Sequence, residues 1–203
     1  YRGGVSTALP EPAGTTGSGA NAINASGVIV GFCRDVDLRA CTWTGDVVTI
    51  LPVPNGASDT IAHAINDAGL IVGSYTDASS DTHICLWQSG NLVYPSEPMG
   101  TTESSGVSVG NNGRFLGNAW SAGGMRALRW MNAATVATLP LPPGATESQA
   151  AAINDVGLAV GSAFTSMDVS LACVWQADLV DVLPSPGNGG SSAVDLNTGG
   201  QII

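Results

Sequence analysis

The chain contains no lysine and few charged residues of either sign. All six basic side chains are arginines, against 16 aspartates and glutamates, and the formal net charge is −10 over 203 residues. Nucleic acids and anionic membranes bind basic surfaces, so neither is an expected partner. No apolar run approaches the roughly 18 residues that cross a bilayer, so membrane insertion is not expected.

Catalytic motifs are also missing. The sequence has no Gly-x-Ser-x-Gly, His-Glu-x-x-His, phosphate-binding loop or Cys-x-x-Cys, and its only histidines are His63 and His83, which we interpret as structural. A ring of repeats would bring together the pair of carboxylates that glycosidases require. Propeller glycosidases usually have long, uneven loops, however, whereas the connecting loops here are short and uniform. We therefore expect no enzyme and assign no catalytic residue, metal ligand or cofactor.

No window sustains the 3.6-residue periodicity of a helix, and the chain contains repeats instead. The nine-residue motif at 23–31 returns at 65–73 and 153–161, with looser copies at 109–117 and 196–203. The glycine after its turn recurs at steps of 42, 44, 44 and 43 residues (Gly27, Gly69, Gly113, Gly157 and Gly200). A period of this size is typical of architectures in which each unit buries its apolar face against its neighbours.

Each repeat contains four short apolar segments, which in the second copy are 60–66, 69–75, 83–87 and 91–95. They are rich in Val, Ile, Leu and Trp and are bounded by Asn, Asp, Gly, Ser and Pro, as strands are. The fourth segment ends in a proline, which closes a strand because it has no N–H to donate. Four strands per repeat, with a tryptophan on the third, predict an all-β protein built of β-propeller blades.

The two ends of the sequence are complementary. Residues 1–10 align with 43–52, which hold the end of the third strand and the fourth strand of a repeat. Residues 191–203 supply the first strand of a repeat and part of the second. We therefore expect a single domain over 1–203, a five-bladed β-propeller of four-stranded antiparallel blades, closed by pairing the half-blades 1–10 and 191–203. The alternative is that these residues are a window of a longer array of repeats.

Cysteine and tryptophan have two expected roles each. Cys33 and Cys41 flank one hairpin, and the sequence leaves open whether they form a disulfide. Cysteines two residues before a repeated tryptophan are expected to be small buried hydrophobes, and the repeated tryptophans to be core (Cys41, Cys85, Cys173; Trp43, Trp87, Trp130, Trp175). Trp120 breaks the repeat pattern and is predicted to stack on a ligand.

A candidate binding surface lies where the fourth strand passes to the next first strand. There each repeat has a glycine followed by small or hydroxyl residues, and three repeats add an acid. In a closed ring these residues would gather at one mouth, where they would hold a cation or accept hydrogen bonds from a sugar. The candidates are Thr16, Ser58, Asp59, Thr102, Glu103, Thr146 and Glu147, together with Trp120. Ordinary turn chemistry on a solvated rim is the alternative.

The third strands read Arg-Ala-Cys-Thr-Trp at 39–43, His-Ile-Cys-Leu-Trp at 83–87, Arg-Ala-Leu-Arg-Trp at 126–130 and Leu-Ala-Cys-Val-Trp at 171–175. With the preceding Ile-Asn-x-x-Gly-x-Ile-Val-Gly, the chain resembles the HAF-type extracellular repeat over nearly its whole length. It departs from that repeat at the His-Ala-Phe triplet that gives the family its name, because His occurs once and Cys or Leu replaces Phe. The resemblance implies a secreted or cell-surface bacterial β-propeller-like protein and transfers no catalytic residue.

Two functions are compatible with these observations. The first is a non-catalytic recognition module, secreted or on the cell surface, that binds a glycan or a protein. The second is a structural subunit of an extracellular filament or matrix, in which the partners are copies of the chain itself.

Overall fold

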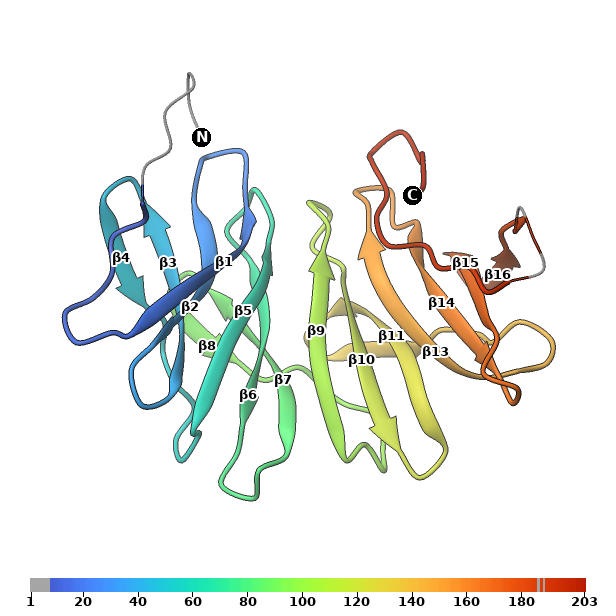
Figure 1. Ribbon diagram of the computed structural model, residues 1–203, viewed down its shortest axis with the longest axis horizontal. Helices are drawn as coiled ribbons and strands as arrows, with labels where there is room; N and C mark the ends of the chain where they lie inside the picture. Colours follow the sequence, from blue (N-terminus) through green and yellow to red (C-terminus); the bar gives the residue numbers. More distant parts are fainter. Residues whose placement is uncertain (1–7, 186, 188) are drawn as a thin grey trace.

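The computed structural model describes residues 8–185, 187 and 189–203, and these residues form sixteen β-strands in four antiparallel sheets (Figure 1). The first sheet contains β1 (Gly17–Ile23), β2 (Ile29–Arg34), β3 (Leu38–Thr44) and β4 (Val47–Ile50). The second contains β5 (Asp59–Ile65), β6 (Ile71–Thr76), β7 (Thr82–Gln88) and β8 (Asn91–Val93). The third contains β9 (Glu103–Val109), β10 (Phe115–Ser121), β11 (Gly124–Asn132) and β12 (Thr135–Thr138). The fourth contains β13 (Ala145–Ile153), β14 (Ala159–Thr165), β15 (Ser170–Gln176) and β16 (Leu179–Val182).

The all-β class is confirmed, and so are the four antiparallel strands predicted for a repeat, in each of the four sheets. In every sheet the strands are hydrogen-bonded in chain order, first to fourth, which is the order within a propeller blade. The described residues contain no helix that would cross a membrane.

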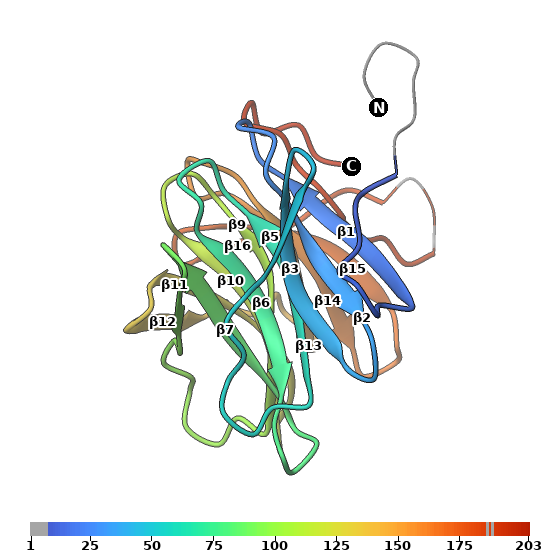
Figure 2. The same cartoon turned by 90° about the vertical axis from the view of Figure 1, so that its left-hand side faces the viewer.

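The predicted blade count and closure are wrong. The described residues form four complete sheets rather than five, and these sheets are not closed into a ring (Figures 1 and 2). Of the fifth repeat, the described residues form one isolated bridge, between Leu196 and Ile202. Residues 8–10 lie in no strand, and the rest of the predicted N-terminal half-blade, 1–7, lies outside the described residues. A single bridge gives no ladder to which third and fourth strands would add, so the described residues form no fifth blade.

The apolar core lies between consecutive sheets. Val72 of the second sheet is packed with Phe115 and Trp130 of the third, and the same arrangement recurs at the neighbouring junctions. The four repeated tryptophans and the three cysteines predicted to be core are all buried, which confirms that prediction. Each sheet thus buries its face against its neighbour, as the repeat period requires.

The repeated tryptophans also make one hydrogen bond each across the junctions. Every indole N–H donates to a backbone carbonyl near the end of the preceding fourth strand, at 2.7–2.8 Å (Trp43 to Pro10, Trp87 to Pro52, Trp130 to Ser96 and Trp175 to Pro140). Pro10 occupies the position that Pro52 and Pro140 hold in later repeats. The segment around Pro10 therefore lies where the end of a preceding fourth strand is expected.

The repeated asparagine explains why the Ile-Asn-x-x-Gly motif recurs. The Oδ1 of Asn66 accepts a bond from Leu70 N at 2.9 Å within its own turn, and its Nδ2 donates to Gly110 O of the next repeat at 3.0 Å. Asn24 and Asn154 make the same pair of contacts. One side chain therefore forms the turn and fixes the distance to the next sheet.

Candidate functional site: a central cavity on the inner strands

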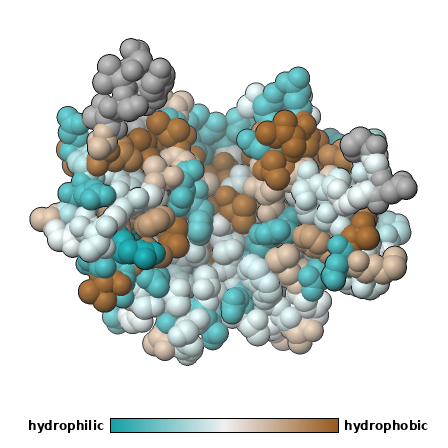
Figure 3. All heavy atoms as spheres, in the orientation of Figure 1, coloured by the Kyte–Doolittle hydropathy of each residue, from teal (hydrophilic) through white to brown (hydrophobic). Residues whose placement is uncertain are grey.

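A cavity of about 540 Å³ lies among the inner strands of all four sheets. Its walls come from the first or second strands β1, β5, β6, β9, β10 and β13. The lining residues are Asn21, His63, Ser74, Ser105, Gly106, Val107, Asn118, Trp120, Gln149 and Ala150. The space-filling view in Figure 3 shows the molecular surface hollowed between the first two sheets and the last two.

The cavity lining is irregular although the surrounding frame is regular. One first-strand position holds Asn21, His63, Val107 and Ala151 in consecutive repeats, and one second-strand position holds Phe32, Ser74, Asn118 and Ser162. By contrast, the buried third-strand tryptophan of the frame recurs in all four sheets. The repeats therefore bring different polar groups to one place, which is what a binding site on a repeat scaffold requires.

Several lining groups are held in place by hydrogen bonds. His63 Nε2 lies 2.9 Å from Ser74 Oγ, and Asn118 Oδ1 accepts from Ala150 N at 2.7 Å. Asn21 Nδ2 donates to Ala62 O at 2.8 Å. Burial lowers the pKa of His63 because a charged imidazole would be desolvated, so this ring is neutral at pH 7.

Two lining side chains remain available to a ligand. The side chain of Gln149 is exposed and makes no hydrogen bond within the described part of the chain, and Trp120 is 37 % exposed. None of the described residues that line the cavity is charged. The site therefore offers one indole, several amides and hydroxyls, and a neutral imidazole.

Of the eight binding residues predicted from the sequence, only Trp120 lines this cavity. The other seven lie at the rim, at or just before the first strands. The hydroxyls of Thr16, Thr102 and Thr146 each donate to a carbonyl of the second strand of their own sheet (Arg34, Trp120 and Phe164, at 3.1–3.4 Å). Ser58 is exposed, and its backbone N donates to Thr76 O at 3.0 Å.

The three predicted carboxylates contact different neighbours. Asp59 Oδ1 accepts from Leu38 N of the first sheet at 2.6 Å. Glu147 lies over Gly124 of the third sheet, so close that a Cβ on that glycine would be 2.6 Å from the carboxylate. Glu103 is exposed and is paired through its backbone with Trp120. Within the described ranges no three His, Cys, Asp or Glu side chains are arranged to hold a metal ion.

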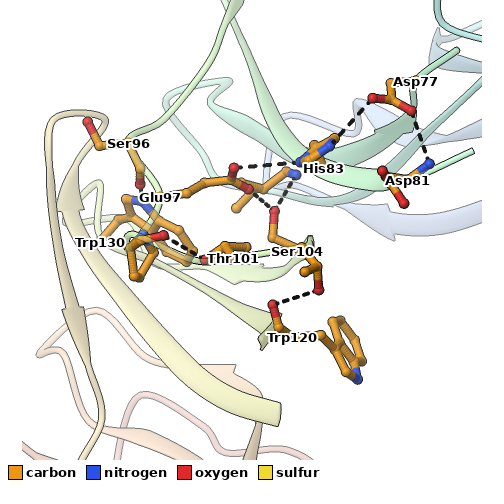
Figure 4. Close-up of polar contacts among 12 residues, drawn as sticks. Asp77, Asp81, His83, Ser96, Glu97, Thr101, Ser104, Trp120 and Trp130 are labelled. Atoms are coloured by element: carbon orange, nitrogen blue, oxygen red, sulfur yellow. Dashed lines mark hydrogen bonds and ion pairs between the residues drawn. The ribbon is translucent and has the colours of Figure 1, made fainter. Parts of the chain in front are cut away.

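A second polar cluster surrounds His83, outside the cavity (Figure 4). The Nδ1 atom of His83 lies 3.6 Å from Glu97 Oε2, and its Nε2 atom lies 3.8 Å from Asp77 Oδ2. Glu97 also accepts from Ser104 Oγ, which in turn accepts from Ile84 N at 2.8 Å. These contacts connect the second sheet to the segment that enters the third.

The two cysteines of the first hairpin are unbonded thiols. Their Sγ atoms lie 2.7 Å apart, and both side chains are buried.

No protein-family model and no curated protein matches this chain. Among solved structures, the chain is similar to the selenomethionine-substituted virginiamycin B lyase from Staphylococcus aureus. The identity is 13 % and the TM-score 0.46, over 91 % of this chain and 69 % of that one.

This comparison corrects one prediction. The expectation that the chain is not an enzyme is contradicted, because the similar solved structure is that of a lyase. At 13 % identity and a TM-score of 0.46, the similarity assigns neither an activity nor catalytic residues to this chain.

Proposed function

We propose that this protein is a recognition module whose central cavity binds a neutral carbohydrate. The observation that carries the proposal is the uncharged lining, in which Trp120 stands beside amide, hydroxyl and imidazole groups. A sugar ring presents C–H groups that pack on an indole face, and hydroxyls that both donate and accept hydrogen bonds.

The charge of the site and of the whole molecule supports a neutral ligand. The described lining contains no arginine to pair with a carboxylate or sulfate, and its histidine is uncharged at pH 7. The net charge of −10 repels anionic ligands at long range. A volume of about 540 Å³ lies within the range of small-ligand pockets, about 300–1,000 Å³.

The proposal extends to the location and family of the protein. We place it among HAF-type extracellular repeat proteins, secreted or on the bacterial surface, because the repeat motif and the tryptophan position resemble theirs. Detection of the native protein in culture supernatant or by labelling of intact cells would support this location. Recovery from the cell interior alone would refute it.

Binding is tested first on a glycan array and then by calorimetry with the sugars that bind. We expect Trp120→Ala to weaken binding at least tenfold, equivalent to about 1.4 kcal/mol, because the stacking face is lost. Gln149→Ala removes a polar contact and is expected to weaken binding less. Met131→Ala serves as the matched control, because Met131 is similarly exposed, at 40 %, and lies outside the cavity.

Two results would contradict the proposal. One is an array without any bound neutral glycan, while a pull-down captures a protein ligand. The other is a bound sugar whose affinity is the same for the wild type and for Trp120→Ala.

A second function, a subunit of an extracellular filament or matrix, is supported by two uncovered apolar positions. Ile203 is 75 % exposed, whereas Val72 and Val160 at the equivalent position are fully buried. Ile23 is 64 % exposed, whereas the equivalent Ile65 is buried. Figure 3 shows apolar surface on both sides of the opening between the first sheet and the C-terminal segment.

The next sheet covers the Val72 position within the chain, so the first sheet of a second copy would cover Ile203 in the same way. Such a head-to-tail contact propagates into a filament. Sedimentation over a concentration series is expected to show association that Ile203→Asp abolishes, while Val36→Asp at an exposed hairpin leaves it unchanged. A monomer at every concentration would refute this function.

A further inference from the structure

We propose that Cys33 and Cys41 are a site of oxidative modification, at which the two thiols close to a cross-strand disulfide. The inference is independent of the carbohydrate proposal. It rests on the distance between the two sulfurs, on their burial and on a comparison of the repeats.

The two sulfurs are already in contact. Their separation of 2.7 Å is shorter than the roughly 3.5–4.0 Å at which non-bonded carbon atoms pack. A disulfide requires about 2.05 Å. In the hairpin Cys33 is opposite Arg39 and Cys41 is opposite Gly31, so the two cysteines are diagonal neighbours on one face of the sheet. Closure therefore requires only a local tightening of β2 against β3.

Packing alone does not demand this pair. The position of Cys33 is held by Tyr75, Ala119 and Ala163 in the other sheets, and that of Cys41 by Cys85, Leu128 and Cys173. Cys85 and Cys173 thus have a tyrosine and an alanine where Cys41 has a second thiol. Among the four complete sheets only the first combines two cysteines at these positions.

The oxidant is a small-molecule disulfide such as glutathione disulfide. One cysteine thiolate attacks a sulfur of the oxidant, displaces one glutathione thiolate and forms a mixed disulfide. The second cysteine thiolate then attacks the protein sulfur of that mixed disulfide and displaces the other glutathione. Two protein thiols lose two protons and two electrons, and the oxidant is reduced to two thiols.

The burial of the pair determines when the bond forms. Cys33 and Cys41 are 1 % and 0 % exposed, and burial raises the pKa of both thiols. The folded protein therefore excludes the oxidant and contains little thiolate. We expect the bond to form while the chain folds in an oxidising medium, and to resist reductants afterwards.

The test compares protein refolded with glutathione disulfide and protein refolded with dithiothreitol, both carrying Cys85→Ala. Arg34 and Arg39 lie between the two cysteines, so trypsin separates peptide 3–34 from peptide 40–114 unless a disulfide joins them. After oxidising refolding we expect the two peptides to remain joined until reduction. The melting temperature should be higher by about 5–10 °C, as expected for closure of a short loop.

Two variants separate the pair from the other thiols. Cys33→Ala, which introduces the residue of the third and fourth sheets, is expected to fold and to lose the link. Cys173→Ala is expected to retain it. The proposal is overturned if every remaining cysteine of the oxidised protein is alkylated after denaturation, or if the link involves Cys173.

Discussion

The glycine that ends each repeated motif is expected to be essential for stability. An added Cβ at Gly73 would lie 2.1 Å from the carbonyl oxygen of Ile61 and 2.7 Å from the Trp87 ring. Real Cβ contacts below 3.0 Å essentially do not occur, so the first strand would have to move by nearly 1 Å. The equivalent glycines are equally crowded by a first-strand carbonyl (Gly31 at 1.9 Å, Gly117 at 2.4 Å and Gly161 at 2.1 Å).

The perturbation is Gly73→Ala, measured by urea denaturation. Overpacking costs about 1–3 kcal/mol, and one disturbed ladder hydrogen bond adds about 1 kcal/mol, so the free energy of unfolding should fall by about 2–4 kcal/mol. Gly69→Ala is the control, because that glycine has a φ of +79° and nothing within 4 Å of an added Cβ. It should lose only about 1–2 kcal/mol, the cost of a left-handed backbone.

Equal losses for the two variants would refute this reasoning, because the account attributes the difference to the carbonyl contact. If Gly73→Ala does not fold, Gly117→Ala provides a milder comparison, since its contact is the longest of the four at 2.4 Å.

Two further predictions concern one junction hydrogen bond and the cavity histidine. Trp87→Phe keeps an aromatic ring but loses the bond to Pro52 O, and should cost about 1–2 kcal/mol in a urea titration, whereas Trp120→Phe should cost almost nothing. Because burial lowers the pKa of His63, the unfolded chain takes up the proton first as the pH falls below the ordinary value of about 6.5. Thermal denaturation should therefore show stability that is complete above that pH and declines towards pH 5. His63→Asn should reduce the decline, and an unchanged decline in this variant would contradict the assignment.

The sequence predicts the strands and the junctions because their causes are local. The turn asparagine, the crowded glycine and the third-strand tryptophan each act within one repeat or on the next, so their spacing alone determines where sheets form and touch. Closure depends instead on pairing between segments at opposite ends of the chain. No local pattern encodes that pairing, and the sheets of the described residues do not contain it.

The candidate site is less predictable from the sequence for a related reason. Trp120 is recognisable because it interrupts the repeat. Asn118 and Gln149 do not interrupt the repeat pattern. Their place in the cavity becomes visible only in the structure, where the inner strands converge. The available signal was variation at a fixed inner-strand position, from Asn21 to His63 to Val107, while the frame around it stays constant. The rim carboxylates Asp59, Glu103 and Glu147 would gather at one mouth only in a closed ring, which the described sheets do not form.

The most direct test of the central claim uses the indole N–H signals of the five tryptophans in an ¹H–¹⁵N NMR spectrum. Four indoles donate to buried-junction carbonyls, while the indole of Trp120 has no such partner within the described residues. When a neutral oligosaccharide is titrated in, the account predicts that the signal missing from Trp120→Phe shifts while the other four remain in place. A saturating sugar that leaves this signal unmoved and shifts another would contradict it.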